Sequence, residues 1–262
     1  MIRVGIGGWT YEPWRGTFYP PGLKQADELR YASRHVTTLE INGTFYRTQT
    51  AASFRKWRDD TPDDFVFSVK GHRKIVNSRK LAEAGEGLDW FFRSGVLELG
   101  DKLGPVLWQF APFRKFDPAD FGAFLALLPK TAGGRQIRHA VEVRHDSFRD
   151  PQFTSLLREH GVAVVHADSD EAPALADLTS NFVYVHLRRT KDDVETGYPA
   201  ADLERWAARA RTWESGGMPE DLPRIDTTAA PKIDRPVFIY LISGAKVRAP
   251  AAAMALIERL GA

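Results

Sequence analysis

The 262-residue sequence has no cysteine. This absence excludes disulfide bonds, thiolate metal ligands and cysteine nucleophiles, and it suits a reducing compartment. Long apolar runs are also lacking, since none approaches the roughly 18 residues that a membrane-spanning helix needs. The N-terminal stretch Met1–Gly8 lacks the apolar core of a signal peptide. We therefore expect a cytoplasmic protein with no membrane partner.

An excess of charge of one sign is missing as well. Lys and Arg number 36 and Asp and Glu number 34, which gives a formal net charge of +2. A balance this even argues against a protein that coats nucleic acid, although it permits a local basic patch. Hydrophobic residues make up 43% of the chain, which is enough for a sizeable core.

Eight short apolar segments recur along the chain, and each is typical of a strand buried on both faces of a parallel sheet. They are Arg3–Gly8, Thr38–Asn42, Phe65–Lys70, Val106–Phe110, His139–Arg144, Ala163–Asp168, Phe182–Arg188 and Val237–Ser243. Helical patterns separate most of them. These cover Asp27–His35, Ala51–Asp60, Leu88–Leu99, Asp117–Leu128, Asp150–His160, Ala200–Glu214 and Pro250–Leu260.

This alternation predicts a TIM-like (β/α)8 barrel, α/β in class, that forms one domain over residues 1–262. The segment between the sixth and seventh strands has room only for a turn or a shortened helix, so we expect an irregular barrel. Ser215–Arg235, rich in Gly and Pro, is expected to form a long loop. An open doubly wound sheet is disfavoured, because Gly5-Ile6-Gly7-Gly8-Trp9 lacks the third glycine of the dinucleotide-binding turn.

Polar residues late in these strands share the parity expected for the barrel interior. They are Glu40, Asn42, Lys70, His72, Glu142, Arg144, His166, Asp168, His186 and Arg188, with Gln109 near the end of the fourth strand. Barrel enzymes place their sites at the C-terminal mouth, where these side chains should converge. Burying so many unpaired charges would be prohibitive, so they must pair with one another, stay hydrated or hold a ligand.

An anion site is the interpretation that we favour for this cluster. Lys70, Arg144 and Arg188, helped by His72 and His186, could clamp a phosphate or carboxylate. Asn42, Gln109, His166 and His186 would orient the ligand. Glu40, Glu142 and Asp168 are then the candidate catalytic acid–base groups, as in a hydrolase or an isomerase. We predict no cofactor and no resident metal.

Other interpretations stay open from the sequence. Glu40–Lys70 and Glu142–Arg144 could be structural ion pairs of a non-catalytic barrel. Carboxylates with His166 and His186 could hold a divalent metal, although the neighbouring cations oppose one. Trp9, Tyr11 and Tyr46 lie near the basic segment Arg73–Lys80, a combination that can stack bases and neutralise phosphates. The alternative function is therefore a nucleic-acid-binding protein or a metal-dependent nuclease.

Several motifs resemble those of a known family. They are Gly7–Tyr11, Trp14–Gly16, Phe18–Pro20, Glu40–Arg47, Phe67–Lys70, Leu103–Phe110, Ala140–His145, Asp168 and Tyr184–Arg188. Together they resemble the YecE-like family, catalogued as domain of unknown function seventy-two. The resemblance implies a TIM-like barrel in a soluble bacterial or archaeal protein, and it assigns no activity and no partner.

The chain departs from the family's pattern at three places. Val76-Asn77 stands where the family tends to have Thr-His, and His186 precedes Arg188 where the family usually has the reverse order. The eighth strand ends in Leu241–Gly244 rather than in a polar motif. The contribution of the eighth strand to the site is therefore open.

Overall fold

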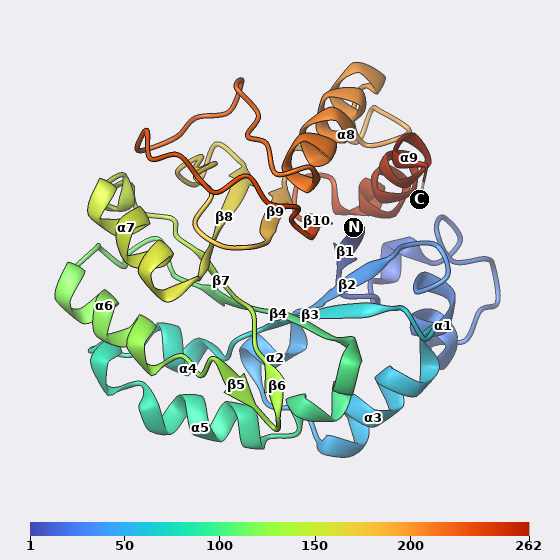
Figure 1. Cartoon of the computed structure of the whole chain (residues 1–262). Coiled ribbons are helices and arrows are strands. Elements are labelled where there is room, and N and C mark those ends of the chain that lie inside the picture. The colour runs from blue at the N-terminus through green and yellow to red at the C-terminus, as the bar shows by residue number, and fades with distance from the viewer. Residues whose placement is uncertain (262) are drawn as a thin grey trace.

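A computed structural model describes residues 1–261 and contains a closed barrel of parallel strands (Figure 1). Around the ring the order is β1-β10-β9-β8-β7-β4-β3-β2. The strands are β1 (Ile2–Gly7), β2 (Thr38–Ile41), β3 (Val66–Lys70), β4 (Leu103–Gln109), β7 (His139–Glu142), β8 (Ala163–Asp168), β9 (Val183–Leu187) and β10 (Val237–Leu241). Each corresponds to one predicted segment, so the TIM-like fold is confirmed.

Helices lie between the strands, and the longer of them cover the outside of the barrel (Figure 1). They are α1 (Glu28–Ala32), α2 (Gly43–Tyr46), α3 (Ala51–Asp60), α4 (Arg73–Val76), α5 (Gly85–Arg93), α6 (Pro118–Leu127), α7 (Pro151–His160), α8 (Ala200–Glu214) and α9 (Ala249–Leu260). Short 3₁₀ turns lie at Glu12–Trp14, Gln25–Asp27, Leu81–Glu83, Val96–Lys102, Asp146–Phe148 and Lys246–Arg248. Within residues 1–261, no helix has the length and apolar character to cross a membrane.

The capping residues explain where two of the longer helices begin. Asp117 accepts hydrogen bonds from two amides at the start of α6, and Asp150 accepts one from Gln152 N at the start of α7. A proline follows each aspartate at the first helical position, where the missing N–H is no loss. Gly161 then ends α7 in the left-handed conformation with φ 67°.

Two predicted helical features differ from the structure. Leu88–Leu99 does not form one helix, because Gly95 adopts φ 112° and separates α5 from the 3₁₀ turn Val96–Lys102. The shortened helix expected between β8 and β9 is absent from the described chain, and that segment instead contacts the long loop before β10. Asp177 accepts hydrogen bonds from the amides of Ile225 and Asp226 in that loop.

A small hairpin lies between α6 and β7 and was not predicted. Its strands β5 (Thr131–Ala132) and β6 (Arg135–Gln136) flank Gly133 and Gly134, whose φ angles are 56° and 75°. Two consecutive positive φ values suit the tight turns that join antiparallel strands. The Gly-Gly pair was the sequence signal for this turn.

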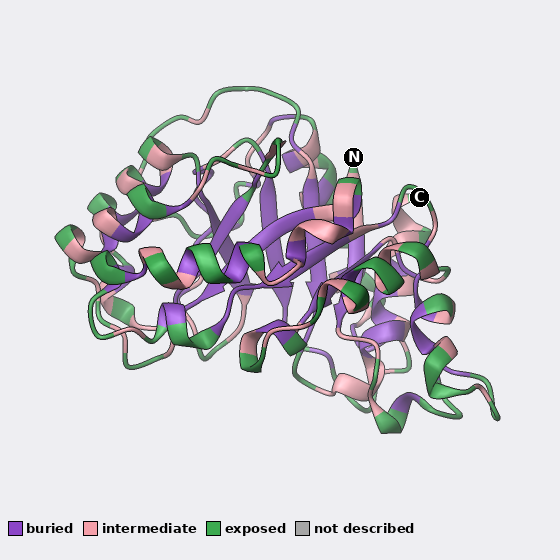
Figure 2. Ribbon diagram, turned by 90° about the horizontal axis from the view of Figure 1, so that it is seen from below, coloured by how far each residue is buried: buried purple, intermediate pink, exposed green. Residues whose placement is uncertain are grey.

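The apolar core has two parts. Side chains inside the ring form one cluster, and side chains between the ring and the helices form the other, so the strands are buried on both faces (Figure 2). The inner cluster consists of Leu107, Ala140, Ala163, Val165, Phe182, Tyr184, Phe238, Tyr240 and Ile242. The barrel is therefore filled with side chains below its mouth.

Candidate ligand-binding site at the barrel mouth

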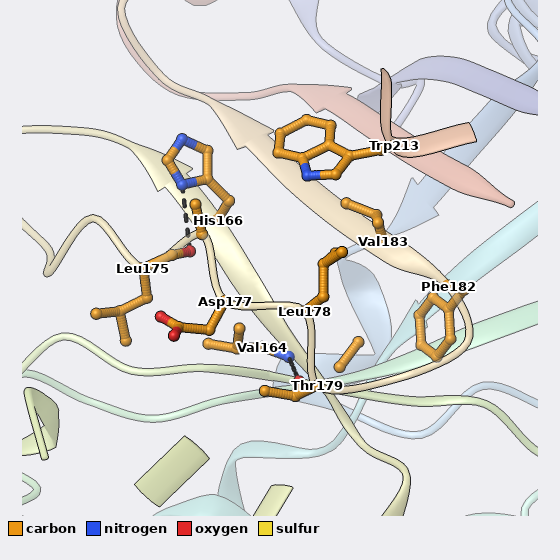
Figure 3. A pocket seen from close by; sticks show the side chains of 11 residues that line it. Val164, His166, Leu175, Asp177, Leu178, Thr179, Phe182, Val183 and Trp213 are labelled. Atoms are coloured by element: carbon orange, nitrogen blue, oxygen red, sulfur yellow. Dashed lines mark hydrogen bonds between the residues drawn. The ribbon is translucent and has the colours of Figure 1, made fainter. Parts of the chain in front are cut away.

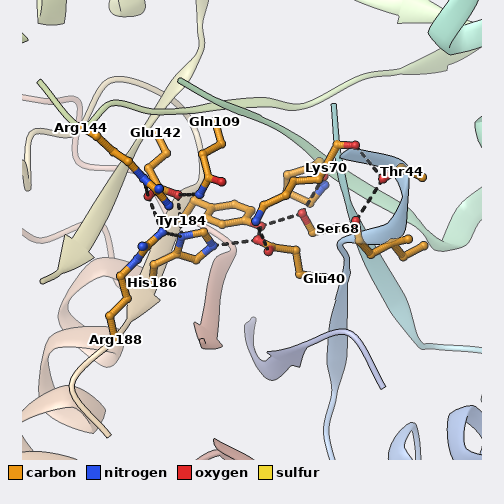
Figure 4. A network of polar contacts seen from close by, with 12 residues as sticks. Glu40, Thr44, Ser68, Lys70, Gln109, Glu142, Arg144, Tyr184, His186 and Arg188 are labelled. Carbon is orange, nitrogen blue, oxygen red and sulfur yellow. Dashed lines mark hydrogen bonds and ion pairs between the residues drawn. The ribbon is translucent and has the colours of Figure 1, made fainter. Parts of the chain in front are cut away.

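Charged side chains from β2, β3, β7 and β9 meet at the C-terminal end of the barrel interior (Figure 4). Glu40 in β2 and Glu142 in β7 are fully buried, and His186 in β9 lies between them. Lys70 at the end of β3 lies beside Glu40. The parallel register brings these late-strand positions to one height in the barrel, as the sequence predicted.

The His186 ring joins the two carboxylates. Its Nε2 is 2.7 Å from Glu40 Oε2 and its Nδ1 is 2.9 Å from Glu142 Oε2. Imidazole donates from both nitrogens only when it is doubly protonated. The pKa values of both carboxyl groups lie below the ordinary glutamate value, which favours the ionised, hydrogen-bond-accepting form of each. The His186 ring therefore bridges the two carboxylates.

Glu142 pairs with more cationic side chains than Glu40 does. Burial raises the pKa of its carboxyl, but His186, Arg188 and Arg144 outweigh burial and hold the pKa well below 4.5. Arg144 Nε is 3.3 Å from Glu142 Oε1, and Arg188 Nη2 contacts the same oxygen. Gln109 Nε2 donates to Oε2 at 2.7 Å. Both oxygens of Glu142 therefore accept hydrogen bonds.

The Glu40 carboxylate has fewer hydrogen-bond and ion-pair partners than Glu142. Burial raises the pKa of its carboxyl, whereas Lys70 and His186 lower it to about 2. The Tyr184 hydroxyl donates to Oε2 at 2.7 Å. Lys70 Nζ is 3.4 Å from Oε1, an ion pair too long to count as a good hydrogen bond, and Oε1 has no hydrogen-bond partner among the described residues.

The mouth holds more positive than negative charge. Lys70, Arg144 and Arg188 oppose only Glu40 and Glu142. The Arg188 side chain is 7% exposed, yet its Nε has no acceptor within the described part of the chain. A buried donor without an acceptor is unfavourable, so this site has unused capacity for an anion.

Two predicted site residues, His166 and Asp168, do not face the interior. The inward positions of β8 are Ala163 and Val165, so the predicted parity was wrong by one residue. His166 packs on Trp206 and Trp213 of α8, and its Nδ1 lies 3.2 Å from Leu175 O. The neighbouring cavity, of about 10 Å³, has room for one water rather than a ligand (Figure 3).

The environment of Asp168 is also separate from the mouth cluster. It accepts a hydrogen bond from Tyr198 Oη at 3.1 Å and pairs with Arg189 at 3.3 Å. Burial raises the pKa of its carboxyl, against the opposing effect of Arg189. Asp168 and His166 thus lie on the outer face of the sheet, where they cannot join Glu40, Glu142 and His186 in a metal site. Among residues 1–261, no group of three or more His, Asp or Glu side chains is arranged to hold a metal ion.

Three other predicted residues lie outside the network of polar contacts. Trp9 packs edge-on against Trp57 and Phe67 in the outer core. His72 caps α4 by accepting from Lys74 N. Tyr46 is 64% exposed, and the Arg73 guanidinium lies 5.8 Å from its ring centroid.

Asn42 lies beside Gly7 of β1, and Tyr11 lies beside Lys246, which follows β10. A side chain at Gly7 would come within 2.9 Å of both Asn42 Nδ2 and Ile242 Cγ2, so glycine is what lets these groups approach β1. Ile242 shows that the eighth strand ends in an apolar side chain, as Leu241–Gly244 suggested. The wall formed by β1 and β10 is therefore less polar than the opposite wall.

Lys246 and Tyr184 belong to this site but were not among the predicted site residues. Lys246 follows β10, and its Nζ lies 4.4 Å from the Tyr11 ring centroid and 5.5 Å from that of Trp14. Its carbonyl accepts from Trp14 Nε1 at 3.0 Å, which fixes the loop. Tyr184 shares the inward parity of His186, and that parity could have identified it.

The sequence matches the family described as "Protein of unknown function DUF72" over residues 3–262. The chain belongs to the DUF72 family. Two curated relatives are UPF0759 protein YunF of Bacillus subtilis, 28% identical over 181 residues, and UPF0759 protein YecE of Escherichia coli K12, 28% identical over 174 residues. The matches cover 65% and 64% of this chain but only 61% and 60% of those proteins, less than two thirds of their length.

Solved structures of DUF72 proteins share the fold. The crystal structure of one from Thermotoga maritima superposes with a TM-score of 0.75 at 21% identity, with full coverage of both chains. One from Enterococcus faecalis superposes with a TM-score of 0.71 at 14% identity, covering 100% of this chain and 96% of that one. The predicted resemblance to the YecE-like family is thus confirmed for this DUF72 protein.

Proposed function

We propose that this DUF72 protein binds a small anionic, phosphate-bearing ligand at the C-terminal mouth of its barrel. Lys70, Arg144 and Arg188 would hold the anionic group. The observation that carries the proposal is the surplus of positive charge over Glu40 and Glu142, together with the buried Arg188 Nε that has no acceptor among residues 1–261. Guanidinium and ammonium groups are the usual partners of phosphate oxygens.

The carboxylates have a different role in this proposal from the acid–base role that the sequence suggested. A general acid or base is most effective when its pKa lies near the working pH. The carboxyl pKa of Glu40 is about 2, and that of Glu142 also lies well below its ordinary value. Both groups are therefore positioning residues, which hold Lys70, His186, Arg144 and Arg188 in place by ion pairs.

Thermal unfolding in phosphate tests the proposal. Inorganic phosphate should raise the Tm by mass action, and chloride at matched ionic strength should not. Lys70→Met should lose most of this increase, whereas Lys80→Met, a change at an exposed lysine paired with Glu83, should keep it. The proposal would be refuted if phosphate stabilised the protein no more than chloride and if soaked crystals showed no anion at the strand ends.

Nucleic-acid binding remains the second candidate, and one observation favours it. The exposed Tyr46 ring with Arg73 beside it could stack a base and contact a phosphate. Oligonucleotide affinity that falls steeply with salt, and that Tyr46→Ala weakens about tenfold or more, would support this candidate. Binding of free phosphate without binding of an oligonucleotide would support the small ligand.

A further inference from the structure

A cavity of about 380 Å³ lies at the N-terminal ends of β7, β8 and β9, the end of the barrel opposite the mouth. The hairpin β5–β6, the C-terminal ends of α6 and α7, and the residues that precede β8 and β9 enclose it. Its volume falls within the range of about 300–1,000 Å³ that is usual for small-molecule sites. The cavity therefore has room for a ligand.

The wall of this cavity is apolar where it is buried and polar where it is exposed. Leu128, Ile137 and Phe182 belong to the buried part. Six polar side chains line the remainder, and none has a hydrogen-bond or ion-pair partner among residues 1–261; they are Lys130, Thr131, Gln136, Arg138, His160 and Asn181. The cavity thus suits a ligand with an apolar body and one polar end.

The hairpin fixes the backbone of two cationic residues, Lys130 and Arg138, beside the cavity. Ile137 N donates to Lys130 O at 3.0 Å, so Arg138 follows a residue that is paired with Lys130. Val106 N in β4 donates to Arg138 O at 2.8 Å. The ammonium and guanidinium groups therefore extend from neighbouring, anchored backbone positions.

The third basic side chain, His160, ends α7. Ser180 Oγ donates to Gly161 O at 2.7 Å, which joins this end of the helix to the segment before β9. Backbone amides that follow the helix bond to the carbonyls of Leu157 and Arg158. Because those carbonyls are already satisfied, they do not compete for the basic side chains of the cavity.

No carboxylate compensates these cations within the cavity. Its lining, as far as residues 1–261 define it, contains neither aspartate nor glutamate. Partial burial lowers the pKa of the Arg138 guanidinium, and no neighbouring acidic group opposes that effect. A partly desolvated guanidinium without a negative partner is stabilised when an anion binds beside it.

We propose that this cavity binds a small organic anion, whose carboxylate or phosphate group contacts Lys130 and Arg138 while its apolar body packs against Ile137 and Phe182. Guanidinium and ammonium groups recognise both kinds of anion. The site is separate from the one proposed at the mouth, since the two lie at opposite ends of the barrel and share no residue.

Titration calorimetry of the full chain with benzoate and with phenyl phosphate tests the proposal. Both anions should bind, and neutral benzyl alcohol should not. Arg138→Gln should weaken binding at this cavity about tenfold or more, because a charge-assisted hydrogen bond is lost. Arg93→Gln is the matched control, since Arg93 is exposed and pairs with Asp89 in α5. In soaked crystals, the anionic group should lie within hydrogen-bond distance of Arg138.

The variant Lys70→Met separates this cavity from the mouth. It should leave the binding event that depends on Arg138 unchanged, while it reduces the rise in Tm with inorganic phosphate. Anion binding that Lys70→Met abolishes and Arg138→Gln leaves intact would overturn this proposal and support the site at the mouth. Failure of both anions to bind, or equal binding of benzyl alcohol, would also overturn it. An unchanged response of Lys70→Met to inorganic phosphate would count against the mouth site alone.

Discussion

At the scale of single residues, the pairing of Glu142 with two arginines determines both stability and binding. Replacing a buried carboxylate by an amide leaves Arg144 and Arg188 without their negative partner. We expect Glu142→Gln to lower the free energy of unfolding by about 3–5 kcal/mol, the usual effect of breaking a buried pair. Phosphate affinity should fall about tenfold, since Arg144 and Arg188 lose the carboxylate that holds them in position.

Urea unfolding and phosphate titration of the same variant measure the two effects. Asp146→Asn is a suitable control, because Asp146 forms an exposed ion pair with Arg149. A variant that loses stability but binds phosphate as tightly as the parent protein would contradict the positioning role of Glu142.

The carboxyl of Glu40 makes stability depend on acid pH. Its pKa is about 2 in the folded protein, below the ordinary 4.5, so the folded state favours the ionised form. This contribution is complete above pH 4.5 and is lost as the pH falls toward 2. Glu40→Gln should be less stable at neutral pH and should flatten that part of the profile. Urea unfolding at several pH values measures it, and an unchanged slope in the variant would count against the ion pair with Lys70.

His139 also makes stability depend on pH, in a less acidic range than Glu40 does. Its Nδ1 accepts from Trp108 Nε1 at 3.1 Å, and its Nε2 lies 2.9 Å from Pro129 O, so the neutral ring satisfies both contacts. Burial lowers the pKa of this ring from 6.5 to about 4. Stability should therefore be complete above pH 6.5 and fall as the pH drops toward 4.

A comparison of His139→Phe with the parent protein isolates this effect. The variant should lose about 1–3 kcal/mol at neutral pH, because Trp108 Nε1 is left without an acceptor. Its stability should change less between pH 6.5 and pH 4, the interval over which the parent ring resists protonation. An equal loss in both proteins over this interval would show that other groups account for it.

At the scale of the elements, the approach of β1 to β2 depends on Gly5. A Cβ at this position would lie 1.8 Å from Thr38 O, a backbone atom that cannot move without breaking the pairing. We expect Gly5→Ala to destabilise the protein by about 3 kcal/mol or more, at the upper end of overpacking effects. Gly7→Ala, which meets only side-chain atoms of Asn42 and Ile242, should be milder. Chemical denaturation ranks the two, and the reverse order would contradict the β1–β2 register.

The positions of the strands could be predicted from the sequence better than which of their side chains point into the barrel. Each strand of this barrel is buried on both sides, so it appears as a short apolar run, and all eight were found. The same burial removes the alternation of apolar and polar residues that would mark the inward face. In β8, Ala-Val-Val-His-Ala-Asp offers apolar residues at both parities, which is why His166 and Asp168 were assigned to the wrong side.

The candidate site was partly predictable for a related reason. Charged residues are rare in the middle of buried strands, so Glu40, Glu142 and His186 stood out. Lys246 lies in a loop after β10, and only the three-dimensional course of that loop brings it onto Tyr11 and near Lys70. The sequence contains no spacing that indicates such a contact.

At the scale of the whole molecule, the closed ring joins the two ends of the chain into one unit. β1 pairs with β10, and Val237 N donates to Met1 O at 3.0 Å, so the barrel cannot close before its last strand is in place. We expect one cooperative unfolding transition, seen at the same denaturant concentration by far-UV circular dichroism and by tryptophan fluorescence. Two separated transitions would contradict the prediction of a single domain over residues 1–262.

The side chains that fill the barrel interior also prevent a ligand from passing through it from one end to the other. Below the charged mouth, Tyr184 bonds to Ser68 and Tyr240 to Thr38, and packed apolar side chains occupy the space beneath them. The barrel interior is therefore closed below the charged mouth. A ligand held by Lys70, Arg144 and Arg188, as we propose, would therefore enter and leave on the same side of the barrel. Any part of such a ligand beyond its anionic group would have to lie outside the ring of strands, because packed side chains fill the interior.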